Sequence, residues 1–311
     1  MDASLAAGLG AAVTRLESLE SAFAGGVGRI GDAVEALGHG ARGRAGAIVS
    51  ALLFLLSMSL RATAGVLAGT LAGLMRLVGG AGRLDRRLAL RGLGDIAAAW
   101  AGGAAAVAGS FTGLLQTALL LQPVDRPLDD REHDVLRRVY GASVRLGNVR
   151  IVAGRAGLFS ATPRPFTLGN RLYMQAVDTV REVDVLVHEC GHIWQHQHHG
   201  PRYIADALWA QWSYQLKGKN AYDWRAESRS KAEWRDFNFE AQAEFLSAVF
   251  RGGRGGGREG DGAFFENPAA GDASFRLRGP DEDLTDLARE AITHVRGLGH
   301  RRPGAGRDLV G

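Results

Sequence analysis

The chain has 311 residues, of which 46% are hydrophobic, with 44 glycines, one cysteine and a formal net charge of +4. Its length predicts two domains, or one domain with a long extension. The single cysteine excludes an intrachain disulfide, and the arginine clusters contain no interleaved aromatic residues. Neither a disulfide-stapled secreted scaffold nor a nucleic-acid partner is therefore expected.

An amphipathic helix is predicted from Val13 to Leu37, because eight apolar residues recur there at steps of three and four. These residues are Val13, Leu16, Leu19, Phe23, Val27, Ile30, Val34 and Leu37. The acidic start of the chain and the absence of a compact apolar run do not match a cleavable signal peptide.

Two charge-poor stretches follow: Ala45 to Met75, with Arg61 as its only charge, and Ile96 to Gln122, with none. Each exceeds the roughly 20 residues that span a bilayer. An arginine-rich loop between them would suit an anionic lipid surface. One interpretation is a membrane-inserting helical hairpin, and the other is a soluble bundle whose central helices are buried all round. Arg61 in the first stretch and the weak Ala/Gly hydrophobicity of the second keep the bundle open as an alternative.

After Pro123 the composition becomes that of an ordinary globular domain. Asp129 or Asp130 can cap a helix that runs to Tyr140, and two short strands are predicted at 148–152 and 171–175. A long helix is expected to begin near Thr179. We predict an α+β fold, with a hydrophobic all-α region over 1–122 and a globular domain, a small sheet plus helices, over 123–251. Residues 252–311 are expected to form a glycine-rich linker, an amphipathic helix from Asp281 to Val295 and a basic tail.

Five of the nine histidines lie between His188 and His199, and the first two belong to an H-E-x-x-H motif. Residues four apart share one face of a helix, so His188 and His192 can both reach one tetrahedral zinc ion. Glu189 would stand beside the metal as the general base for a zinc-activated water. The remaining members of this stretch are interpreted as polar residues near the helix end (His196, His198 and His199) and a small buried residue (Cys190).

A catalytic zinc site needs a third protein ligand. The metzincin pattern would use His198, but Gln195 replaces its turn glycine and every methionine precedes His188. This pattern is therefore excluded, and replacing Gln195 by alanine is expected to be nearly neutral.

The other source of a ligand is a later helix, Trp234 to Phe250, in which Glu240 and Glu244 stand one turn apart. Glu240 would be the third ligand, and the plainer alternative is a solvent-facing glutamate. Glu227 and Glu233 are rival ligands without a partner at this spacing.

The H-E-x-x-H motif followed by Glu240 and Glu244 resembles the paired motifs of gluzincin zinc metallopeptidases. From about Arg126 to Phe250 the order of elements is similar to that of small bacterial gluzincin-like domains, often labelled Vgr-related or found beside contractile injection systems. The resemblance implies a zincin-like fold that binds Zn²⁺ through His188, His192 and Glu240. Glu244 would then steady a ligand histidine from behind.

The activity that the resemblance implies is hydrolysis of a peptide or protein substrate by a zinc-dependent metalloprotease. Candidate donors to the oxyanion are Tyr203, Tyr214 and Tyr222. The strand at 171–175 is expected to be the sheet edge that pairs with extended substrate.

Membrane lipid and secretion-system components are the other expected partners. The expected localisation is membrane-associated, or exported without a classical signal peptide, in a bacterial protein. Two alternatives stay open: a catalytically silent zincin-like binding or delivery module, and a membrane-active helical protein whose histidines sense metal or pH.

Overall fold

The structure is a computed structural model that describes residues 23, 25–38, 43–82, 85–154, 164–175, 179, 181–230, 233–252 and 283–297. The first part of the predicted amphipathic helix, most of the glycine-rich linker and the basic tail after residue 297 lie outside the described residues.

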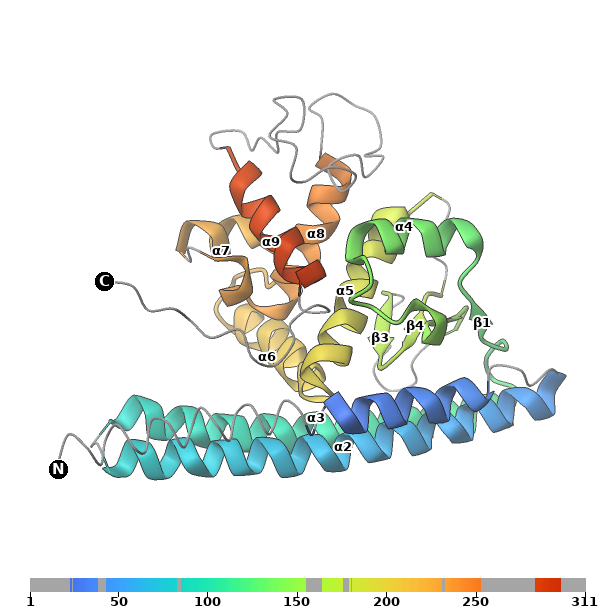
Figure 1. Cartoon of the computed structure of the whole chain (residues 1–311), viewed down its shortest axis with the longest axis horizontal. Coiled ribbons are helices and arrows are strands. Elements are labelled where there is room, and N and C mark those ends of the chain that lie inside the picture. Colours follow the sequence, from blue (N-terminus) through green and yellow to red (C-terminus); the bar gives the residue numbers. More distant parts are fainter. Residues whose placement is uncertain are drawn as a thin grey trace.

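Two long helices, α2 (Gly43–Gly82) and α3 (Arg86–Ala118), form a hairpin, and the globular part of the chain lies on one side of it (Figure 1). Asp85 caps α3, since its carboxylate accepts hydrogen bonds from the backbone N–H groups of Arg87 and Leu88. Both helices are long and apolar enough to cross a membrane, although half of the most apolar window of α2 is buried against the protein.

The chain over residues 25–38 is helical, as predicted, but its large apolar side chains do not form its buried face. Ile30 and Leu37 are 58% and 76% exposed, whereas Asp32 and Glu35 are buried. The reason is a buried cation on α2: Arg61 forms an ion pair with Asp32, and Ser57 donates a hydrogen bond to Glu35. Charge pairing, which a hydrophobic pattern does not register, therefore decides which face of this helix is buried.

The sheet is small and mixed, with the strand order β1-β2-β4-β3. Its strands are β1 (Arg126–Pro127), β2 (Arg150–Val152), β3 (Phe166–Leu168) and β4 (Arg171–Tyr173). β4 pairs in parallel with β2 and antiparallel with β3. The strand predicted at 171–175 is thus present, but it is internal. The expectation that it forms the sheet edge is wrong, because β3 pairs on its outer side and becomes the edge.

The helices of the globular part are α4 (Asp130–Tyr140), α5 (Val183–His199), α6 (Arg202–Leu216), α7 (Trp224–Ser230), α8 (Phe239–Gly252) and α9 (Thr285–Gly297). Short 3-10 turns lie at Leu146–Asn148 and Trp234–Asp236, so the helix predicted from Trp234 begins in fact at Phe239. Asp129 caps α4 as predicted, in a capping box with Glu132. The fold is α+β.

The main hydrophobic core surrounds α5, with α4, α8 and α9 packed against it. The predicted apolar face of the last helix is buried there, including Leu284, Ala288 and Val295. A second cluster joins the hairpin to the sheet, since Phe54, Met58 and Ala106 pack with Leu168 and Tyr173. The hairpin is therefore part of the same packed structure as the globular part.

Candidate metal centre

The H-E-x-x-H motif occupies the middle of α5, where His188, Glu189 and His192 are all buried. Gly191 lets α5 approach α8 closely, because a Cβ on Gly191 would lie 3.0 Å from the Cβ of Ala243. This approach brings Glu240, in the first turn of α8, next to the motif.

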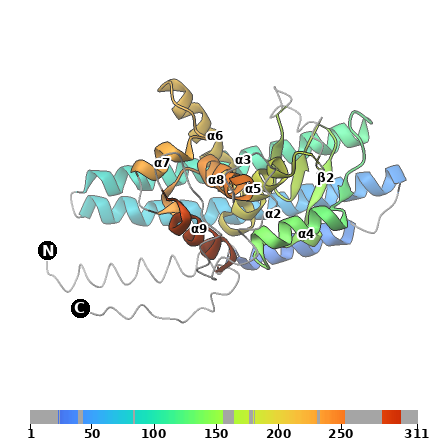
Figure 2. The same ribbon diagram turned by 90° about the horizontal axis from the view of Figure 1, so that it is seen from above.

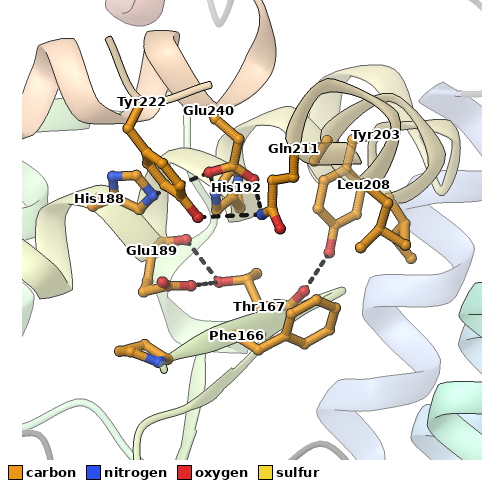
Figure 3. A pocket seen from close by; sticks show the side chains of 13 residues that line it. Phe166, Thr167, His188, Glu189, His192, Tyr203, Leu208, Gln211, Tyr222 and Glu240 are labelled. Atoms are coloured by element: carbon orange, nitrogen blue, oxygen red, sulfur yellow. Dashed lines mark hydrogen bonds and ion pairs between the residues drawn. The ribbon is translucent and has the colours of Figure 1, made fainter. Parts of the chain in front are cut away.

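The side chains of His188, His192 and Glu240 converge on one point (Figure 3). Nε2 of His188 lies 3.6 Å from Oε2 of Glu240, and Nε2 of His192 lies 3.4 Å from the same oxygen. One potential ligand atom of each residue lies within 4.8 Å of those of the others. Two imidazole nitrogens and one carboxylate oxygen are a donor set of catalytic zinc sites, and ligands about 2 Å from an ion lie at separations of this order.

The electrostatics of the pocket also fit a cation. Oε2 of Glu240 is buried and has no hydrogen-bond partner, which is costly unless a positive charge stands beside it. Burial alone would raise the pKa of Glu240, but the two imidazoles beside it lower that pKa overall. Burial would likewise lower the pKa of His188, yet the carboxylates of Glu240 and Glu244 beside it raise that pKa to about 10. Without an ion, protons on the imidazoles supply the charge that this carboxylate needs.

Each of the three residues is held by a further side chain. Oε2 of Glu244 lies 3.1 Å from Nδ1 of His188, and Arg251 donates a hydrogen bond to Glu244 at 2.6 Å. Gln211 on α6 donates a hydrogen bond to Oε1 of Glu240 at 2.8 Å. Such contacts fix the orientation of a metal ligand and tune its basicity. Glu244 therefore contacts His188 on the side away from Glu240, whereas Gln211 carries no sequence signal that would have identified it.

Gln195 holds the remaining histidine, and the expectation that its replacement is nearly neutral does not agree with its position. Oε1 of Gln195 lies 2.8 Å from Nδ1 of His192, and its Nε2 donates hydrogen bonds to the carbonyl oxygen of Phe239 and to Gln242. Its side chain is 1% exposed. The available sequence signal was its spacing: Gln195 lies three residues after His192, on the same side of α5.

Glu189 faces the pocket and is held by the edge strand of the sheet. The hydroxyl of Thr167 on β3 donates a hydrogen bond to Oε2 of Glu189 at 2.6 Å (Figure 3). Thr167 and its neighbour Phe166 both line the pocket, together with Tyr222 and Leu208. The base predicted from the motif thus has a defined orientation toward the three converging side chains.

The structure separates the three tyrosines that the sequence could not distinguish. The ring of Tyr222 lies 5.7 Å from that of His188, and its hydroxyl accepts a hydrogen bond from Gln211. The hydroxyl of Tyr203 is already used, since it donates to the carbonyl oxygen of Thr167 and accepts from Gly169.

Tyr214 donates its hydroxyl proton to Glu227, and it is not among the residues that line this pocket. Tyr222 is therefore the best placed of the three to act on a bound molecule.

The rival ligands have other partners. Glu227 accepts hydrogen bonds from Tyr214 and from the backbone of Asn238, and the half-exposed Glu233 pairs with Arg235. Cys190 is buried in the core, and burial raises the pKa of its thiol well above the ordinary value.

The later histidines of α5 point away from the centre. His198 contacts the carbonyl oxygen of Trp194, and His199 stacks on Phe239. His196 departs from its expected role as a polar residue near the helix end, because it is fully buried and neither ring nitrogen has a hydrogen-bond partner. Burial, with Arg61 and Arg145 nearby, lowers the pKa of His196 well below its ordinary value. This ring therefore remains neutral.

Comparisons with protein-family models, curated proteins and solved structures returned no match for this chain.

Proposed function

We propose that the chain is a zinc-dependent metallopeptidase of the gluzincin type and that its globular part is a zincin-like domain. The observation that carries the proposal is the convergence of His188, His192 and Glu240 in one buried pocket beside Glu189. A helix with H-E-x-x-H and a glutamate from a later helix are the ligand arrangement of this class. Zinc, when bound, supplies Lewis-acid activation of a water molecule and of the scissile carbonyl.

Glu189 acts as the general base, taking a proton from the attacking water and later passing it to the leaving nitrogen. Its carboxylate must face the reacting atoms throughout both steps. The hydrogen bond from Thr167 provides this orientation. Because Thr167 belongs to β3, the edge strand of the sheet also orients the general base.

Tyr222 donates a hydrogen bond to the carbonyl oxygen as that oxygen becomes negatively charged. Burial, with Glu240 and Glu189 nearby, raises the pKa of the Tyr222 hydroxyl, so it stays protonated at neutral pH. In the absence of substrate this hydroxyl lies beside Glu240, and Gln211 donates a hydrogen bond to its oxygen.

The substrate is proposed to be an extended peptide segment that lies along β3, the edge strand of the sheet. Phe166 and Leu208 give this side of the pocket an apolar lining, and Leu208 is 38% exposed. We therefore expect a preference for an apolar side chain next to the scissile bond.

Zinc content and hydrolysis by the full chain test the proposal together. The purified protein should hold about one zinc ion, and His192→Ala should lose it. Glu189→Gln should keep the metal, because residue 189 is not a ligand, yet abolish cleavage of a fluorogenic peptide library. Glu182→Gln, at an exposed position just before α5, is the matched control and should behave as the parent.

Three results would contradict the proposal. They are equal zinc content in the parent and in a variant lacking both histidines, undiminished turnover in Glu189→Gln, and no hydrolysis of any library member by the zinc-loaded parent.

A further inference from the structure

The exposed side of α2 is lined by large apolar side chains along nearly its whole length. These residues are Val49, Leu52, Leu56, Leu60, Leu67, Leu71, Leu74 and Val78, each at least 38% exposed. They recur at steps of three, four and seven, so they share one face of the helix. Arg61, the only charged residue between Ala45 and Met75, is not on this face, because it is 4% exposed and paired with Asp32.

The exposed side of α3 follows the same pattern. Its large exposed apolar residues are Leu90, Leu93, Trp100, Phe111 and Leu115. Nε1 of Trp100 donates a hydrogen bond to Thr70 on α2, and this bond joins the two apolar sides across the hairpin. We call the two sets of residues together the outer face. Contiguous apolar surface of this extent is unusual on a protein surrounded by water.

The interior of the hairpin is built from small residues instead. A Cβ on Gly73 would lie 2.5 Å from the carbonyl oxygen of Gly92, and one on Gly69 would lie 2.5 Å from the Cβ of Ala99. A water-soluble helix pair buries its large apolar side chains and exposes polar ones. Small residues inside and leucines outside form the reverse arrangement, which is typical of helices in contact with lipid. This pattern favours lipid over a second protein as the cover of the outer face.

The opposite side of the hairpin is occupied by the globular part, and this fixes the orientation. Phe54 and Met58 pack on the turn at Gly169, and farther along the hairpin Asp95 pairs with Arg202 of α6. The views in Figures 1 and 2 show the globular part along the middle of the hairpin. A hairpin crossing the bilayer would carry these ion pairs and the sheet into hydrocarbon, at high cost.

The length of the outer face leads to the same orientation. From Val49 to Val78 it covers roughly 44 Å at 1.5 Å per residue, which exceeds the ~30 Å of bilayer hydrocarbon. We propose that the hairpin lies in the plane of a membrane surface, with the outer face in the acyl region and the globular part in water. This inference does not depend on the peptidase activity.

The charges beside the outer face fit anionic lipid. A cavity of about 870 Å³ between α3 and α6 is lined by Arg76 and Arg202, which form ion pairs with Asp95, and by Arg91. Among the described residues, Arg91 forms no hydrogen bond or ion pair. Arg86 and Arg87 at the start of α3 add further exposed positive charge. These cations lie where the hairpin meets the globular part or turns back, which is the level of the headgroups in this orientation.

Cosedimentation of the full chain with vesicles tests membrane binding. Vesicles of phosphatidylcholine with phosphatidylglycerol should bind the protein more tightly than phosphatidylcholine alone. The variant Leu67→Glu/Leu71→Glu should weaken binding roughly tenfold or more, because it places two carboxylates in the acyl region. Ser228→Glu/Ser230→Glu places the same charges on α7 and should bind as the parent does. Equal binding by the two variants, or no binding by the parent, overturns the proposal.

Single-cysteine labelling tests the orientation, since the native Cys190 is buried. With protein added outside sealed vesicles, an impermeant maleimide should label Asp134→Cys on α4 and Arg86→Cys at the hairpin turn equally. Leu67→Cys should be labelled in free protein and protected once vesicles are added. Protection of Arg86→Cys by vesicles would indicate a hairpin that spans the bilayer. Protection of Leu67→Cys in a dimer without vesicles would indicate that a second copy of the chain covers the outer face. Either result overturns the proposal.

Discussion

Replacement of Gln195 by alanine is the sharpest test of the arrangement around the proposed metal centre. The change removes the contact at 2.8 Å between Oε1 of Gln195 and Nδ1 of His192, together with two hydrogen bonds to the backbone and side chain of α8. His192 then loses the group that fixes its ring orientation. We expect zinc affinity to fall about 10- to 100-fold, or roughly 1.4–2.7 kcal/mol.

The same substitution should also reduce stability. Gln195 is buried, so the groups that lose their hydrogen bond to it have little access to water as a replacement partner. A lost buried hydrogen bond costs about 1 kcal/mol, and a buried group left unsatisfied costs more. We expect the free energy of unfolding of the metal-free protein to fall by roughly 2–3 kcal/mol.

Competition with a fluorescent chelator measures the affinity, and urea unfolding in excess chelator measures the stability. Gln197→Ala is the matched control, because Gln197 lies on the same helix and its hydrogen bonds go to Arg145 and Asn170. It should lower stability without changing zinc affinity more than about twofold. The reasoning is refuted if Gln195→Ala binds zinc as tightly as this control.

Three further predictions concern the pocket and its helix. Glu244→Ala should weaken zinc binding about 10- to 100-fold by freeing the ring of His188, measured with the same chelator. Tyr222→Phe should lower kcat without loss of zinc, whereas Tyr203→Phe should mainly lower the unfolding temperature; equal kcat losses would contradict these roles. Burial lowers the pKa of His196 in the folded state, so below about pH 6.5 this ring binds a proton only when the chain is unfolded. The free energy of unfolding therefore falls as the pH falls. Replacing His196 by leucine should remove up to about 2 kcal/mol of the stability lost between pH 7.5 and pH 5, measured by urea unfolding, and an unchanged pH dependence would contradict this.

The sequence alone determined the parts of this protein that depend on local spacing. The cap of α4 at Asp129, the strands at 150–152 and 171–173 and the apolar face of α9 follow from short-range patterns, and the structure confirms them. The placement of His188 and His192 on one face of α5 is of the same kind, because helix geometry fixes the relation between residues four apart. The spacing of Glu240 and Glu244 likewise fixes their relation on α8, but not which residues of α5 they meet.

Contacts between distant segments decided the rest. Whether Glu240, rather than Glu227 or Glu233, meets the two histidines depends on how α8 packs on α5, and no local pattern contains that information. The identity of the edge strand, by contrast, is set by the hairpin that joins β3 to β4 through Gly169 and Asn170, and this Gly-Asn pair is a turn signal present in the sequence. Gln211 reaches Glu240 only because α6 packs beside α8.

The orientation of the N-terminal helices is the clearest case of tertiary control. Hydrophobic periodicity over residues 25–38 identified a helix but not its buried face, which contains Asp32 because this carboxylate pairs with Arg61 of α2. Likewise, an apolar composition made α2 a candidate for both a membrane segment and a buried helix. Composition records how apolar a helix is, whereas its packing partners decide which of its sides remain uncovered. In this chain those partners occupy the small-residue sides and leave the leucines of α2 exposed.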